Sequence, residues 1–111
     1  MTQPLIDASV LDELSEAMGQ DFAAELIATF LNEGPVMLAQ LKEAATAEDA
    51  DAYRRAAHSI KSNAQIFGAT ALANQARDME LGTLEDAELA VGSLETTYDQ
   101  TAQALKVALD A

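Results

Sequence analysis

Apolar positions recur along most of the chain at intervals of three and four residues, the spacing of one face of an α-helix. No segment shows the strict apolar–polar alternation that is typical of a half-buried strand. The last part of the chain shows the helical spacing most clearly, in a helix expected from about Glu85 to Leu109. Its apolar seam consists of Val91, Leu94, Tyr98, Ala102, Leu105 and Leu109. The pattern therefore predicts an all-α protein.

Capping and breaking residues divide the first half of the chain into helices. Asp7 or Ser9 is placed to cap a first short helix that ends at Gly19. Asp21 is placed to cap a second helix. Pro35 falls inside this second helical pattern, where it either kinks the helix or ends it, and the sequence leaves both alternatives open.

Two more helices are expected before the last one. The first runs from about Asp49 to Phe67 and the second from Thr70 to Leu81, with Gly68 between them. The core face of the first consists of Tyr53, Ala57, Ile60, Ala64 and Phe67. Short connections between amphipathic helices favour antiparallel neighbours. We therefore expect residues 1–111 to form one domain, an up-and-down antiparallel four-helix bundle with a short extra N-terminal helix.

The composition narrows the classes of function. Six Lys and Arg residues against 19 Asp and Glu give a net charge of −13, which disfavours binding to nucleic acid or to an anionic membrane. The chain has no cysteine and therefore no disulfide or thiolate metal site. Residues 1–5 do not resemble a signal peptide, and no uninterrupted apolar segment approaches the roughly 20 residues that span a bilayer. We expect a cytoplasmic monomer.

The charge is unevenly distributed. Between Tyr53 and Arg77 there is no Asp or Glu, and this stretch contains four of the six basic residues together with the only histidine. Helix geometry places His58 about 140° from the core residue Tyr53, so the imidazole should point outward. By the same geometry, four polar or cationic residues lie within about 40–60° of it. These are Arg54, Lys61, Ser62 and Gln65.

This arrangement suits phosphoryl transfer. A neutral imidazole is a good nucleophile toward phosphorus at physiological pH, since its ordinary pKa is near 6.5. Lys61 would offset the charge of the phosphoryl oxygens, Ser62 is small enough to leave room for a partner, and Gln65 could donate a hydrogen bond. No glycine-rich nucleotide loop or kinase motif is present. The alternative is a solvated surface histidine without a role. A metal site is disfavoured because no second histidine exists and no carboxylate lies one turn from His58.

The segment from Ala57 to Ala69 resembles the signature of histidine-containing phosphotransfer (HPt) domains, roughly A-H-x-L-K-G/S followed by G-A. It reads AHSIKSNAQIFGA, with Lys61 three residues and Gly68 ten residues after His58. Arg77-Asp78-Met79-Glu80 stands where the family often has an apolar–Glu pair, and the resemblance extends more weakly over most of the chain. Ile60 replaces the commoner leucine, a core exchange that should cost little. Ser62 replaces the commoner glycine; serine is a familiar variant there, and we expect it to restrict slightly how closely a receiver approaches.

The resemblance implies a four-helix bundle that carries phosphoryl groups in a multistep His–Asp relay. His58 would accept the phosphoryl group, assisted by Lys61 and Gln65. The implied partners are receiver domains of response regulators, with a hybrid histidine kinase as a further candidate. The receiver would supply Mg²⁺, so this chain should need no cofactor or metal. We expect the partner to contact Arg54, Arg55 and Ser62, and an adjoining surface of the second helix that includes Ala28 and Leu31.

Three alternatives remain open at this point. The first is an HPt-like binding module that docks on a receiver without exchanging phosphate. The second is an acidic helical adaptor unrelated to relays, with an interface elsewhere. The third, a histidine kinase fragment, would require an ATP-binding domain for which the chain has no room.

Overall fold

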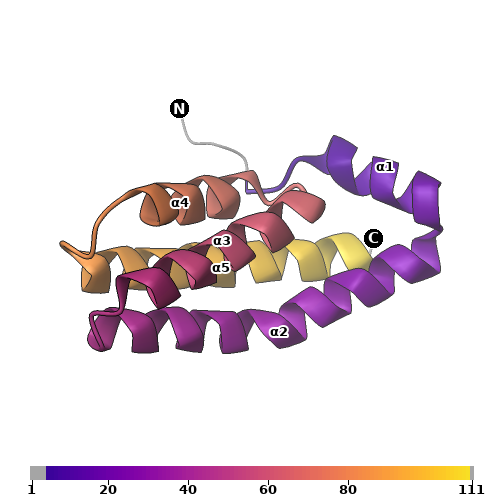
Figure 1. Ribbon diagram of the computed structural model, residues 1–111. Coiled ribbons are helices and arrows are strands. Elements are labelled where there is room, and N and C mark those ends of the chain that lie inside the picture. The colour runs from indigo at the N-terminus through magenta and orange to yellow at the C-terminus, as the bar shows by residue number, and fades with distance from the viewer. Residues whose placement is uncertain (1–4, 111) are drawn as a thin grey trace.

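The computed structural model describes residues 5–110, with side chains to residue 108, and contains five helices and no strand in that range (Figure 1). The helices are α1 (Ala8–Met18), α2 (Gln20–Thr46), α3 (Ala50–Ile66), α4 (Thr70–Leu81) and α5 (Ala87–Asp110). Helices α2 to α5 pack in a ring, α2 on α3, α3 on α4, α4 on α5 and α5 on α2, while α1 packs on α2. The all-α prediction is confirmed, and the ring agrees with the expected four-helix bundle and extra N-terminal helix.

The core fills the interior of this ring. All five residues expected on the core face of α3 are buried, and so are Val91, Leu94, Tyr98 and Leu105 of the predicted α5 seam. The side chain of Leu109 lies outside the described residues. Phe30 of α2 joins three elements, because its ring lies 5.1 Å from that of Phe67 and 5.8 Å from that of Tyr98. Four small residues of α3 and α4 belong to this core, Ala57, Ala64, Ala73 and Ala76.

The helix ends agree with the predicted capping residues, with one exception. The carboxylate of Asp7 accepts a hydrogen bond from the backbone N–H of Ser9, and Gly19 closes α1. The prediction that Asp21 caps the second helix is wrong, because α2 begins at Gln20 directly after Gly19. Gly19 closes one helix and opens the next, which leaves Asp21 inside the first turn. Its charge there is still favourable beside the positive end of the helix dipole.

Helix α2 continues through Pro35, so the choice between a kink and a break is decided in favour of one continuous helix. A proline has no N–H to donate to the carbonyl four residues earlier, here that of Leu31. The hydroxyl of Tyr98 in α5 donates a hydrogen bond to this carbonyl, at 3.2 Å. Gly34 makes room for the Tyr98 ring, since a Cβ at this position would overlap it. The tertiary contact with α5 therefore satisfies the group that Pro35 leaves without a donor.

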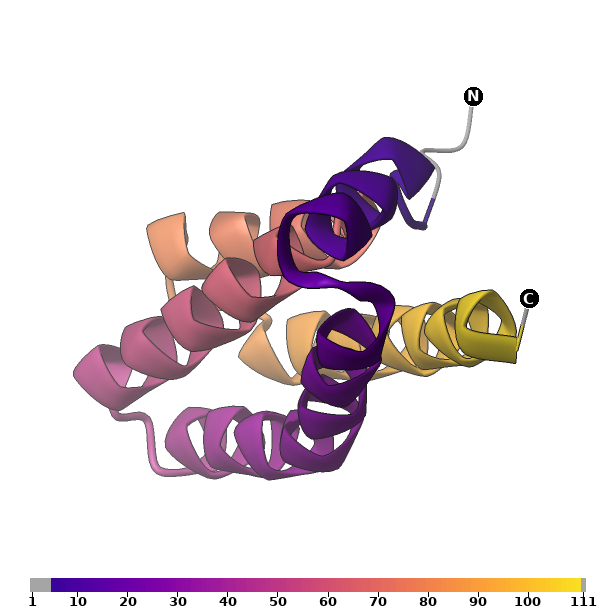
Figure 2. The same ribbon diagram turned by 90° about the vertical axis from the view of Figure 1, so that its right-hand side faces the viewer.

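The turn between α3 and α4 is tied to the beginning of α1. Gly68 adopts φ +68°, a left-handed conformation that favours glycine. Its carbonyl accepts a hydrogen bond of 2.7 Å from the backbone N–H of Asp7. A Cβ on Gly68 would lie 2.8 Å from the carbonyl oxygen of Asp7, so only glycine permits this approach. The contact holds the start of α1 beside the end of α3 (Figure 2).

By length and composition alone, α2 would be long and apolar enough to cross a membrane. The core helix of a soluble protein meets the same criterion. Ile27, Phe30 and Leu41 of α2 are buried in the core of the bundle, and 28% of the apolar window of this helix is buried.

Candidate functional site

His58 lies in the middle of α3, and its side chain is 57% exposed. Its neighbours Ala57 and Ile60 on the same helix are buried. The outward position predicted from helix geometry is confirmed. The imidazole is therefore accessible to a molecule that approaches the outer side of α3.

A carboxylate from α4 connects the two residues of α3 that the sequence motif singled out. Oε1 of Glu80 lies 2.7 Å from Nδ1 of His58, and Oε2 of Glu80 lies 2.8 Å from Nζ of Lys61. Glu80 is 22% exposed, so part of this contact is shielded from water. The three side chains form one connected group across the α3–α4 contact.

The charge of Glu80 determines which nitrogen of His58 is free. The hydrogen bond from Lys61, and to a smaller extent that from His58, holds the pKa of Glu80 below its ordinary value of 4.5. Glu80 is therefore ionised at neutral pH, and an ionised carboxylate can only accept hydrogen bonds. Nδ1 of His58 must carry the hydrogen in this contact. In the neutral imidazole, Nε2 is then left with a free lone pair.

Lys61 is less accessible than its helical position suggested. Its side chain is only 20% exposed, because it reaches toward α4 and pairs with Glu80. The expectation of an exposed Lys61 is therefore wrong. Helix geometry alone could not reveal the acceptor on the neighbouring helix. The ammonium group nevertheless stays beside the imidazole, since both are bound to the same carboxylate.

The arginines near His58 have no acidic partner. Arg54, Arg55 and Arg77 are exposed, and none of them forms an ion pair with another residue of the described range 5–110. Arg77 precedes Glu80 by three residues on α4, so it lies on the same side of that helix. These positive charges are consequently available to an external partner.

Ser62 and Gln65 lie on the outer side of α3, Ser62 half-buried and Gln65 exposed. The side chain of Gln65 forms no hydrogen bond with His58 in the part of the chain that the structure describes. The close neighbours of the imidazole are therefore Glu80 and Lys61. Any role of Gln65 depends on the phosphorylated or partner-bound state.

The surface of α2 predicted to adjoin His58 lies elsewhere. Met37 marks the side of α2 that faces α3, since its sulfur lies 3.7 Å from the side-chain nitrogen of Asn63. Pro35 and Leu38 line a hollow together with Tyr98 of α5. Leu31 and Ala28 precede them by about one and two turns, on this α5 side of the helix. By this helical count, the two residues lie away from the side of α2 that faces α3. Their contact with a partner stays a prediction.

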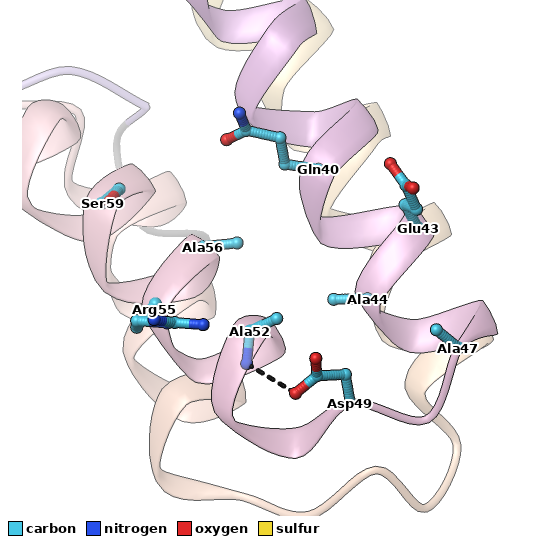
Figure 3. Close-up of a pocket in the computed structure, with 9 residues that line it drawn as sticks. All are labelled: Gln40, Glu43, Ala44, Ala47, Asp49, Ala52, Arg55, Ala56 and Ser59. Carbon is cyan, nitrogen blue, oxygen red and sulfur yellow. Dashed lines mark hydrogen bonds between the residues drawn. The ribbon is translucent and has the colours of Figure 1, made fainter.

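A groove of about 410 Å³ lies between the end of α2 and the beginning of α3 (Figure 3). Alanines form much of its wall, and Gln40, Arg55 and Ser59 lie at its edges. Asp49 caps α3 here, since its carboxylate accepts a hydrogen bond from the N–H of Ala52. His58, Lys61 and Glu80 do not line this groove. Among the described residues, no three His, Cys, Asp or Glu side chains gather as they would around a metal ion.

Glu80 is the functional residue that the sequence-based site prediction omitted. Glu80 is the acidic residue of the apolar–Glu pair in the family pattern. This position in the pattern was the only feature of the sequence that pointed to it. Its role could not be assigned from spacing, because the pairing of α3 with α4 decides which of their side chains meet.

Comparisons with known proteins show what this chain is similar to. The family model of the Hpt domain matches residues 25–104. The crystal structure of histidine-containing phosphotransfer protein B (HptB) from Pseudomonas aeruginosa is similar to this structure, with a TM-score of 0.91 and 28% sequence identity. The match covers 98% of this chain and 97% of that chain. A search of curated proteins gave no match.

Proposed function

Because the chain belongs to the Hpt domain family, we propose that it carries a phosphoryl group on His58 between receiver-domain aspartates in a multistep two-component phosphorelay. The observation that carries the proposal is the contact of Glu80 with Nδ1 of His58 at 2.7 Å. It leaves Nε2 as the nucleophile on an accessible imidazole. The whole of residues 1–111 would serve this one role as a single domain.

The transfer step needs no cofactor in this chain. The lone pair of Nε2 attacks the phosphorus of a receiver's aspartyl phosphate, the N–P bond forms, and the P–O bond to the aspartate breaks with its electrons on the carboxylate. The Nδ1 hydrogen stays in place and remains bound to Glu80. In the reverse direction, a receiver carboxylate attacks the phosphorus and the neutral imidazole leaves. The donor of the phosphoryl group is always a partner protein, so the chain acts as a carrier and not as a kinase.

Lys61 supplies positive charge close to the imidazole of His58. Phosphorylation brings negative oxygens to His58, and the Lys61 ammonium is already held close by through Glu80. Electrostatic stabilisation is strongest where the group is positioned in advance. Gln65 is proposed as a hydrogen-bond donor to the phosphoryl oxygens, and Ser62 as the small residue that lets the receiver approach. The receiver supplies Mg²⁺ at its own acidic pocket.

The proposed partners are response-regulator receiver domains and a hybrid histidine kinase that contains one. A net charge of −13 disfavours nucleic acid and anionic membrane surfaces as partners. We propose a cytoplasmic monomer, since receiver domains of such relays work in the cytoplasm and the charge opposes self-association.

Incubation with a radiolabelled phosphorylated receiver tests the proposal. The chain should acquire an acid-labile, base-stable label, and His58→Gln should acquire none, because His58 is the only histidine. Circular dichroism should show that the variant keeps the helical fold, since the His58 side chain is exposed. Labelling of His58→Gln at the parental rate would refute the proposal.

The same assay separates the two binding alternatives. A non-catalytic module would bind the receiver at the His58 face and acquire no label. An unrelated adaptor would acquire no label and show NMR shift changes away from α3. The proposal requires both transfer and shift changes around His58.

A further inference from the structure

The side of the bundle formed by α2 and α5 lies across the ring from the α3–α4 contact that holds His58. Two hollows follow one another along this side, with volumes of about 350 and 310 Å³, and Lys42 and Glu95 line both of them. We propose that the two hollows form one trough that binds a basic amphipathic helix of a partner protein. Such a partner would leave the imidazole accessible, so this inference does not depend on phosphotransfer.

The trough has a length and a floor that suit a helix. On α2 its lining runs from Pro35 to Thr46, which is about 16 Å along the helix axis, or three turns. Most of its floor is apolar or small. These floor residues are Pro35, Leu38, Ala39, Ala45, Val91 and Gly92. Packed helices approach each other more closely where the side chains at the contact are small. A helix that lies in the seam between α2 and α5 would therefore cover this floor.

Gly92 is an exposed glycine in the interior of α5, at a position where packing within the bundle does not require one. A Cβ at this position would meet nothing within 4 Å. Glycine weakens a helix interior relative to alanine, because its backbone loses more freedom on folding. A glycine in such a place permits the close approach of another molecule to the backbone. Because Gly92 lines the trough, a partner helix that lies close against α5 accounts for it.

Charge decides which helix fits the trough. The α5 wall carries Glu88, Glu95 and Asp99, whose spacing places them on one side of the helix. Lys42 is the single cation of the lining, and none of these four side chains forms an ion pair within residues 5–110. The unpaired carboxylates complement lysine or arginine side chains that flank an apolar stripe. A second copy of the chain fits poorly, because both copies carry a net charge of −13.

The probe for the trough is a synthetic peptide of about 18 residues, or five helical turns, with leucine and alanine on one side and lysine on both flanks. A peptide of the same composition in scrambled order controls for the general attraction of cations to an acidic protein. The amphipathic peptide should shift backbone NMR signals of α2 and α5 along the trough and leave those around His58 unchanged. Isothermal titration should give the scrambled peptide a Kd at least about tenfold higher, because it cannot bury an apolar side in the trough.

Gly92→Leu should raise the Kd of the amphipathic peptide about tenfold or more, because the leucine side chain would fill the space that the partner helix needs. The fold should tolerate this change, since a Cβ at position 92 points into open space. Ser93→Leu is the matched control, because Ser93 is the exposed neighbour of Gly92 on α5 and does not line the trough. It should leave the Kd unchanged, and melting temperatures should confirm that both variants fold.

A second pair of variants tests the acidic wall. Glu95→Gln combined with Asp99→Asn should weaken binding of the peptide, whereas Glu13→Gln combined with Asp78→Asn removes the same charge at exposed positions elsewhere and should not. An equal loss of affinity in the two double variants would mean that binding follows net charge alone, and it would overturn the proposal. Equal affinity of Gly92→Leu and the parent, or of the two peptides, would overturn it as well. So would shift changes centred on α3, because the peptide would then cover His58.

Discussion

Oε1 of Glu80 lies 2.7 Å from Nδ1 of His58, although the two residues are 22 positions apart in the chain. This contact makes α4 part of the candidate site, which the motif on α3 alone would not include. Because the other carboxylate oxygen binds Lys61 at 2.8 Å, Glu80 holds both the imidazole and the ammonium group in place. The proposed chemistry therefore depends on the pairing of two helices.

Glu80→Gln should slow phosphoryl transfer about ten- to a hundredfold, by analogy with metal-bound histidines that lose the partner fixing their orientation and tautomer. A neutral amide also accepts a hydrogen bond from Nδ1 less strongly than a carboxylate does. ¹⁵N NMR of His58 should show an increased share of the tautomer with hydrogen on Nε2. Asp78→Asn on the same helix is the matched control, since Asp78 is exposed and forms no ion pair within the described residues. An unchanged tautomer and rate would contradict the role of Glu80.

Lys61→Ala should lower the transfer rate by roughly a hundredfold, because it removes a positioned positive charge. The free energy of unfolding should fall by only about 1 kcal/mol, because the Lys61–Glu80 pair is shielded from water only in part. Single-turnover transfer and thermal denaturation measure the two effects. Lys106→Ala on the exposed side of α5 controls for the loss of one positive charge. Parental transfer by a folded Lys61→Ala protein would exclude the assigned role.

Arg54→Glu should lower the association rate with a receiver without unfolding the bundle. Arg54 is exposed and unpaired among the described residues, so its charge acts mainly on approaching molecules. Rising ionic strength should slow association of the parent markedly, and it should slow association of the variant less. Stopped-flow measurements at several salt concentrations provide the comparison, with Lys106→Glu as the control. Association that is indifferent to salt and to Arg54→Glu would refute charge-guided docking.

Tyr98→Phe should destabilise the fold by about 0.5–1.5 kcal/mol, the usual net value of one hydrogen bond. The variant removes the donor to the Leu31 carbonyl, which Pro35 leaves without its helical partner. Tyr53→Phe is the matched control, because the Tyr53 hydroxyl forms no hydrogen bond with another described residue. Urea denaturation measures both. Equal stability of the two variants would show that the Tyr98 hydroxyl does not support α2 at Pro35.

The local pattern of the sequence was sufficient to predict the helices and the outward direction of the His58 side chain. Apolar spacing identified the buried side of α3. Asp7 and Asp49 begin helices where expected, and Gly19 ends one. These features depend on residues within one or two turns of each other, so they are encoded in short stretches of sequence. Asp21 is the exception, because two helices meet at Gly19 without an intervening loop.

Contacts between helices were decided only by the tertiary structure. The continuation of α2 through Pro35 is supported by the hydrogen bond from the Tyr98 hydroxyl to the Leu31 carbonyl. The two residues are 67 positions apart, so no pattern within one helix predicts this contact. The pairing of Glu80 with His58 and Lys61 depends on the register of α3 against α4, which no pattern within either helix reveals. The sequence by itself thus determined that the single histidine points outward. The fold decided which of its nitrogens is free to react, because that depends on a carboxylate brought from another helix.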